Sequence, residues 1–354
     1  MAPGVDPGYE SRGGFGGMPS TVGRGKGFSG ISGSDSPKEW HDEGVHLFQG
    51  DSLDFYQSWP SPQTIVSDGA YGILGFHGDP AQFKELPRWY EPHVQAWSQK
   101  ASPQTTLWFW NSEMGWASVH PILEKHGWSY VSCNTWDKGK GHMAGNVNTN
   151  TIRRFPVVSE VCVQYVWEAK INGLTIKDWL RAEWQRTGLP FRKANEACGV
   201  KDAASRKYFD RGHLWYPPPR APFEKLVAFA NRHGAPEGCP YFSRDGQVPL
   251  TGAEWQATRS LFQCPHGVTN IWQRSPLRGQ ERLKVPAGKK PAHLNQKPLD
   301  LMRMIIEAST VKGGVVWEPF GGLFTGSLAA KGLDRLAYGA EIDPDYFHLG
   351  VKRF

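Results

Sequence analysis

Three acidic residues stand at positions where side-chain chemistry is plausible. Asp68, Glu318 and Glu341 each follow directly on a short run that is apolar or rich in β-branched residues. Such a run predicts a buried strand. Open α/β sheets bind ligands at the carboxyl ends of their strands, so carboxylates placed there are candidates for a binding or catalytic site.

The elements around Glu318 and Glu341 suggest a nucleotide site. We expect a strand at Val315–Trp317, a glycine turn at Gly321-Gly322, a helix at Thr325–Lys331 and a second strand ending before Glu341. Glycines let the backbone approach a ligand closely, and an acid on the second strand can hold both hydroxyls of a ribose. The turn has neither a G-x-G-x-x-G pattern nor a phosphate-binding lysine, so a dinucleotide or triphosphate site is not predicted.

The segment before this unit adds His293 and Lys297-Pro298, followed by an amphipathic stretch from Leu299 to Ser309. Together these motifs resemble the S-adenosylmethionine-dependent DNA amino-methyltransferases, which modify N4 of cytosine or N6 of adenine. That family follows H-x-x-x-K-P with a helix, then D-P-F-x-G-S-G-T, and later G-x-E-I-x-x-x-Y. Here Glu318 replaces the aspartate, and Leu323-Phe324 replaces Ser-Gly.

The resemblance implies S-adenosyl-L-methionine as cofactor. Asp51, which follows a predicted strand at Val45–Phe48, resembles the element that reaches the adenine of the cofactor in this family. The cofactor-binding residues implied by the resemblance are Asp51, His293, Lys297, Pro298, Glu318, Pro319, Phe320, Gly321, Gly322, Glu341 and Ile342.

The resemblance also assigns a catalytic role to Asp68, Gly69 and Tyr71. The family motif is D/S-P-P-Y/F, and this chain has Gly69-Ala70 in place of the two prolines. The target amino group is a weak nucleophile because its lone pair is delocalised into the ring. Asp68 and the carbonyl of Gly69 can accept its two N–H bonds, and Tyr71 can stack on a base that has been flipped out of the duplex.

The strand and helix alternation stops in residues 171–291, where we expect a target-recognition region. Leu189–Phe209 reads as two helices about a turn at Gly199-Val200, which resembles a helix-turn-helix. Lys201, Arg206 and Lys207 would then contact DNA. The same geometry also occurs in proteins that bind no DNA, so both interpretations stay open.

The expected architecture is a Rossmann-like α/β class I methyltransferase with a mostly parallel seven-stranded sheet, one antiparallel strand and the helical recognition region. Residues 39–170 would form the catalytic half and residues 292–354 the cofactor half. This motif order resembles the beta class of the family. Residues 1–38 are rich in Gly, Ser and Pro, and we expect them to be a disordered tail.

Composition is consistent with a nucleic-acid partner. The net charge of +6 over 354 residues suits a polyanion without proving one. The five cysteines include no C-x-x-C pair, which favours a reducing, cytoplasmic location and no disulfide framework. Cys239 and Cys264-Pro-His266 are spaced too weakly to predict a metal. The chain has no apolar run long enough to cross a membrane and no signal-peptide core.

The resulting hypothesis is site-specific methylation of double-stranded DNA. Protection of that DNA from a cognate restriction endonuclease is implied by the family alone. Methylation at C5 of cytosine is disfavoured because no Pro-Cys nucleophile motif occurs. Two alternatives remain: a catalytically decayed DNA-binding protein, which the departures at Gly69-Ala70 and Leu323-Phe324 motivate, or an RNA methyltransferase. Cytosine N4 and adenine N6 are not distinguished.

Overall fold

The computed structural model describes residues 39–354 except 77, 140–149, 237, 285–291 and 294, so the expected tail at 1–38 lies outside the described residues. Within these ranges a nine-stranded sheet has the order β1-β2-β11-β10-β3-β4-β6-β5-β9. Its strands are β1 (Glu39–Asp42), β2 (Val45–Gln49), β3 (Thr64–Ser67), β4 (Thr106–Asn111), β5 (Trp128–Asp137), β6 (Ser159–Trp167), β9 (Ile271–Gln273), β10 (Val315–Glu318) and β11 (Leu336–Glu341).

The sheet is mixed but mainly parallel, as expected for the predicted α/β class. Strands β2, β11, β10, β3 and β4 run parallel to one another, whereas β1 is antiparallel to β2, and β6 is antiparallel to both β4 and β5. The predicted count of seven strands is too low by the two edge strands. β1 is a short polar strand paired with β2, and β9 comes from the region expected to be purely recognition elements. Neither short segment carries the apolar pattern that marks a strand.

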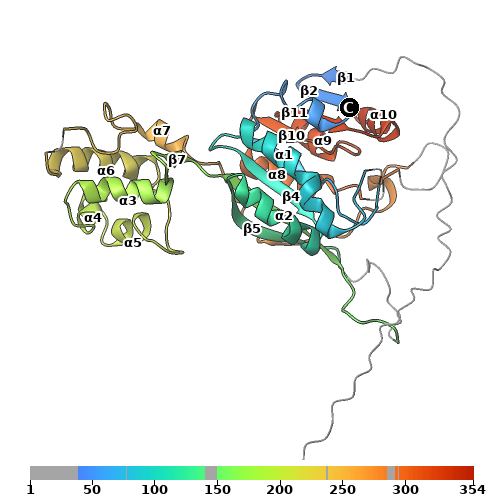
Figure 1. The fold of residues 1–354 in the computed structure, drawn as a ribbon, viewed down its shortest axis with the longest axis horizontal. Coiled ribbons are helices and arrows are strands. Elements are labelled where there is room, and N and C mark those ends of the chain that lie inside the picture. Colours follow the sequence, from blue (N-terminus) through green and yellow to red (C-terminus); the bar gives the residue numbers. More distant parts are fainter. Residues whose placement is uncertain (1–38, 77, 140–149, 237, 285–291, 294) are drawn as a thin grey trace, which may run out of the picture. The chain divides into compact units, whose positions relative to one another are not determined.

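Helices cover both faces of this sheet (Figure 1). On β4, Leu107 and Phe109 pack in one apolar core, while Trp108 and Trp110 pack in the other, because successive side chains of a strand point to opposite faces. The first core includes α1 (Leu86–Lys100) and α2 (Glu113–Lys125). The second includes α8 (Leu299–Ser309), α9 (Thr325–Lys331) and α10 (Pro344–Val351).

The strand order brings the three acids of the sequence motifs to one edge of the sheet. β11, β10 and β3 are consecutive neighbours and parallel, with Glu318 paired to Gly339 and Trp317 paired to Ile65. Glu341, Glu318 and Asp68 stand at or just after the carboxyl ends of these strands. Segments from opposite ends of the chain therefore form one ligand-binding edge.

Helices α3 to α7 form a second group (Figure 1). This group has its own apolar core. A two-stranded hairpin precedes these helices in the chain. Within their core the ring of Phe223 stacks on Trp255, with 4.4 Å between the ring centroids. The elements are β7 (Lys170–Ile171), β8 (Leu174–Thr175), α3 (Ile176–Arg186), α4 (Lys193–Cys198), α5 (Ala203–Tyr208), α6 (Arg220–His233) and α7 (Gly252–Gln256). The predicted pair of helices about Gly199 is confirmed as α4 and α5, with Gly199 in the left-handed region at φ 68°.

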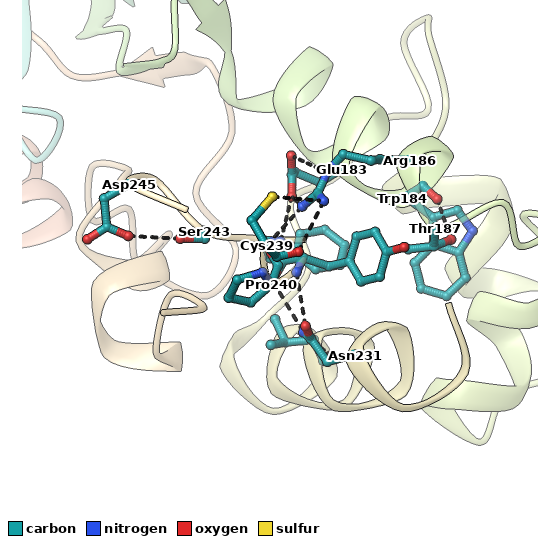
Figure 2. Close-up of polar contacts among 12 residues, drawn as sticks. Glu183, Trp184, Arg186, Thr187, Asn231, Cys239, Pro240, Ser243 and Asp245 are labelled. Atoms are coloured by element: carbon teal, nitrogen blue, oxygen red, sulfur yellow. Dashed lines mark hydrogen bonds and ion pairs between the residues drawn. The ribbon is translucent and has the colours of Figure 1, made fainter. Parts of the chain in front are cut away.

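Polar contacts hold residues 239–242, which follow α6 in the chain, against α3 and α6 (Figure 2). Glu183 of α3 accepts hydrogen bonds from the Phe242 amide at 2.6 Å and from Arg186 at 2.7 Å. Arg186 also donates to the carbonyl of Pro240 at 2.9 Å, and Asn231 of α6 accepts from the Tyr241 amide at 2.9 Å. The segment 239–242 is therefore held from α3 and α6 together.

Across the described ranges, none of the helices combines the length and apolar character that crossing a bilayer requires.

Candidate active site

A cavity of about 940 Å³ opens at the carboxyl ends of β3, β10 and β11. The motif regions around Asp68 and around Glu318 both line it, as expected for strands whose carboxyl ends share one edge. The expected site residues that line it are Asp51, Asp68, Gly69, Tyr71, His293, Lys297, Glu318, Pro319, Phe320, Gly321, Gly322, Glu341 and Ile342. Pro298, also expected at the cofactor, is not among the lining residues and directly precedes α8.

Glu341 shapes the glycine turn of this cavity. Its carboxylate accepts the amide of Gly322 at 2.6 Å and that of Asp343 at 2.8 Å. Burial raises the pKa of Glu341 to about 7, although these amide bonds act in the opposite direction. The amide of Gly50 donates to the Glu341 carbonyl at 2.9 Å, which brings the turn containing Asp51 to the same strand end.

Glu318 lines the cavity, but its carboxylate is already occupied by the helix that follows. It accepts the amides of Gly326 and Ser327 at 2.7 and 2.6 Å and the Ser327 hydroxyl at 2.7 Å. These amides belong to the first turn of α9, whose N-cap residue Phe324 supplies no side-chain cap. Burial nevertheless raises the pKa of Glu318 to about 7. Glu318 therefore caps α9, and its predicted contact with a cofactor stays a prediction.

Phe324 explains how the turn tolerates the loss of the family's Ser-Gly. Phe324 is fully buried and lies in the left-handed region at φ 54°, a conformation that suits glycine. Its ring fills space that glycines leave open: a Cβ at Gly321 would lie 2.2 Å from the ring, and one at Gly350 would lie 2.6 Å away. The strained backbone, which costs on the order of 1–3 kcal/mol, is offset by burial of the aromatic ring.

Asp68, the expected catalytic carboxylate, is held by Lys297 and Tyr71. Its Oδ1 accepts from Lys297 Nζ at 2.7 Å and from the Tyr71 hydroxyl at 2.9 Å. Lys297 also pairs with Glu160 at 3.3 Å, and Glu160 pairs with Lys138. Lys297 was expected at the cofactor, and Glu160 was not among the expected site residues.

The Gly69-Ala70 turn is shaped by packing in place of prolines. A Cβ at Gly69 would lie 2.7 Å from the ring of Phe320 and 2.8 Å from the hydroxyl of Tyr90. The carbonyl of Ala70 accepts from the Tyr90 hydroxyl at 3.0 Å and from Asn111 at 2.8 Å. Glycine is therefore required where Phe320 of the cofactor turn packs against the catalytic turn.

Asp79 holds the loop that follows the Gly69-Ala70 turn through hydrogen bonds to its backbone. Its Oδ1 accepts the amides of Tyr71 and Gly72 at 2.9 and 2.7 Å, and its Oδ2 accepts those of Ile73 and Gly75 at 3.1 and 2.8 Å. Asp79 is 4% exposed. One buried carboxylate thus fixes the loop that carries Tyr71, a role that no local sequence signal indicated.

Helix α1 supplies an aromatic wall that the sequence analysis did not assign. Phe320 lies 5.2 Å from Trp89 and 4.9 Å from His93, measured between ring centroids. Burial lowers the pKa of His93 to about 4, so this imidazole is neutral at physiological pH. Trp89 and His93 line the cavity together with Arg88, so this side combines aromatic rings with a guanidinium group.

The predicted DNA-contacting residues lie outside the cavity. Lys201, Arg206 and Lys207 are exposed; Lys201 lies just before the N-cap residue of α5, and the other two lie within this helix. Arg206 lies 3.8 Å from Asp202 in an exposed ion pair, which leaves its charge available to solvent. Contact of these three side chains with DNA stays a prediction.

Comparisons with known proteins identify the family. Residues 63–352 match the N6/N4 family model described as DNA methylase. The chain belongs to this DNA methylase family. It is 38% identical over 84 residues to the type II methyltransferase M.HinfI of Haemophilus influenzae, a match covering 24% of this chain and 23% of that protein. It is 35% identical over 188 residues to M.HindIII of the same species, covering 51% of this chain and 56% of that protein.

These alignments span about half or less of each curated relative's length. In fold, the DNA methylase chain is similar to the cytosine-N4-specific PvuII DNA methyltransferase, with a TM-score of 0.51 and 13% identity. That likeness covers 88% of this chain and 86% of the PvuII enzyme. It supports a shared architecture and carries no information on the target base.

Proposed function

We propose that this protein transfers a methyl group from S-adenosyl-L-methionine to an exocyclic amino group of a base in double-stranded DNA, at cytosine N4 or adenine N6. One observation carries the proposal: Asp68 and the Glu318–Gly322 turn line the same cavity as Glu341. Membership of the DNA methylase family supports the same reaction class.

The cavity suits a nucleoside cofactor. Its volume of about 940 Å³ is in the range of small-molecule sites, and it combines aromatic side chains with a few carboxylates. Glu341 would accept the ribose hydroxyls, and Asp51 would face the adenine end. When bound, S-adenosyl-L-methionine supplies an electrophilic methyl group on its sulfonium sulfur. The closely packed Gly321-Gly322 turn would let the backbone approach this ligand.

The catalytic turn, with Asp68, Gly69 and Tyr71, would prepare the amino group for attack. A base has to leave the duplex stack to reach a recessed carboxylate, so the target nucleotide would be flipped out. Asp68 and the Gly69 carbonyl would accept its N–H bonds and make the nitrogen lone pair available. Tyr71 would stack on the ring. Acceptors that are already in place cost no reorganisation as positive charge develops on the nitrogen.

Residues 171–291 would bind and select the DNA. Lys201, Arg206 and Lys207 are exposed cations near a helix pair, and such side chains mostly contact phosphates and set the register of a protein on a duplex. We further propose that methylation protects DNA from a cognate restriction endonuclease. The names of the relatives M.HinfI and M.HindIII as type II methyltransferases support this role.

Transfer of a labelled methyl group from the cofactor to DNA tests the proposal, and mass spectrometry of the digested nucleosides identifies the base. Asp68→Ala should abolish transfer and retain cofactor binding, measured by calorimetry. The matched control is Asp334→Ala, which removes an exposed aspartate from its ion pair with Lys312. Label in RNA alone would favour an RNA methyltransferase. DNA binding without cofactor binding or transfer would favour a decayed enzyme.

A further inference from the structure

We propose that Lys297 is a positioning residue of the acceptor site, which holds Asp68 by Oδ1 and leaves Oδ2 for the amino group of the target base. The inference rests on the proposed methyl transfer and gives Lys297 a role different from cofactor binding. Three observations carry it: the contacts of Lys297, the charges behind it and the distribution of bonds on Asp68.

The first observation is that the Lys297 ammonium is buried against the catalytic turn. Its side chain is 2% exposed. Nζ lies 2.7 Å from Asp68 Oδ1, 3.1 Å from the Tyr71 hydroxyl and 3.3 Å from Glu160 Oε2. The carbonyl of Asn295 lies 3.5 Å away. Among the described residues, the groups that bond to the ammonium are therefore acceptors, and the two nearest belong to the catalytic turn.

The second observation is a set of charges that holds Lys297 in place. Glu160 of β6 lies between Lys297 and Lys138, so cations and anions alternate from Lys138 to Asp68. Burial alone would lower the pKa of Lys297, but Asp68 and Glu160 outweigh it and the pKa is raised. Burial alone would raise the pKa of Glu160, but Lys297 and Lys138 outweigh it and the pKa is lowered. Lys297 and Glu160 therefore stay charged at neutral pH.

The third observation is that the bonds to Asp68 fall on one oxygen. Lys297 and the Tyr71 hydroxyl both donate to Oδ1, and among the described residues no hydrogen bond reaches Oδ2. Asp68 also lines the cavity. A carboxylate fixed through Oδ1 has a fixed rotation about its Cβ–Cγ bond, so Oδ2 is the acceptor presented to a substrate amine.

This arrangement predicts a loss in turnover when Lys297 is removed. Without the ammonium, Asp68 keeps only the bond from the Tyr71 hydroxyl, so its carboxylate can rotate further and the amine is less well aligned with the methyl donor. A misplacement of about 1 Å costs on the order of 100-fold in rate. Lys297→Met should therefore lower kcat by about 100-fold, with cofactor affinity and the KM for DNA close to those of the wild type. Lys297→Arg, which keeps the charge and the donors, should recover part of the rate.

Lys312→Met is the matched control, because Lys312 forms an exposed ion pair with Asp334 at the same 2.7 Å separation. It should leave kcat, KM and cofactor affinity unchanged. Lys297→Met leaves two buried carboxylates with one fewer cation, which could unfold the protein. The double variant Lys297→Met/Glu160→Gln keeps Lys138 and Asp68 as balancing charges. It should fold, as monitored by thermal unfolding, and remain slow.

A double variant that turns over at the wild-type rate would overturn the inference. So would a loss of cofactor affinity with unchanged kcat in Lys297→Met, since Lys297 would then belong to the cofactor site. Absence of label transfer by the wild-type protein would refute the proposed methyl transfer itself, and the inference with it. The wild-type assay therefore separates failure of the function from failure of the role of Lys297.

Discussion

Replacing Asp79 with alanine should loosen the catalytic turn and destabilise the fold together. In the native structure its carboxylate accepts four backbone amides from the loop that carries Tyr71. In Asp79→Ala these four amides lose this acceptor. The loop would then sample several conformations, and Tyr71 would no longer hold Asp68 through its hydroxyl.

The size of the stability loss follows from which amides become unpaired. The bonds from Tyr71 and Gly72 are buried, whereas those from Ile73 and Gly75 are only partly buried and can be hydrated. A buried donor without a partner costs about 1–3 kcal/mol. Two such donors give a loss of roughly 2–6 kcal/mol in the free energy of unfolding. The accompanying shift of Tyr71 should lower kcat, by about 100-fold for a displacement near 1 Å.

Urea unfolding and labelled-methyl transfer measure the two effects on the same preparation. Asp245→Ala is the matched control, because Asp245 also accepts backbone amides, from Gln247 and Val248, but at an exposed turn in the helical region. It should cost little stability and leave kcat unchanged. If Asp79→Ala unfolded at the same urea concentration as Asp245→Ala and kept the wild-type kcat, the loop would be braced by other contacts and this reasoning would be wrong.

Two pH dependences follow from the buried glutamates. Burial raises the pKa of Glu318 to about 7 from an ordinary 4.5. The protonated carboxyl therefore stabilises the fold fully below pH 4.5, and this contribution is lost as the pH rises through about 7. Relative to Glu318→Gln, the wild-type free energy of unfolding should fall by up to about 1.4 kcal/mol per pH unit in that window, measured by urea titration. If the free energies of unfolding of the wild type and of Glu318→Gln changed equally with pH, this reasoning would be wrong. Burial likewise raises the pKa of Glu341 to about 7. Because an ionised carboxylate is the better acceptor of ribose hydroxyls, cofactor affinity by calorimetry should increase from about pH 6 to about pH 8 and stay flat in Glu341→Gln. Equal pH profiles for both proteins would place Glu341 outside the cofactor contact.

Much of the architecture could be read from local patterns. Runs such as Val315–Trp317 end at a carboxylate, and parallel strands must bring such ends to a common edge. This reasoning is enough to place Asp68, Glu318 and Glu341 at one cavity. It did not reveal β1 or β9, because Glu39–Asp42 is mostly polar and Ile271–Gln273 is only three residues long with two exposed side chains.

The sequence alone determined which residue types reach the cavity, because motif spacing and strand periodicity are local properties of the chain. Only the tertiary structure decided which of their atoms bond to each other. Lys297 meets Asp68 across 229 positions, and Glu318 turns its carboxylate into the start of α9. The buried ring of Phe324 likewise needs the space beside Gly350, which belongs to α10. Such pairings depend on distances between elements, which the packing of the sheet and its helices sets and which no neighbouring residues encode.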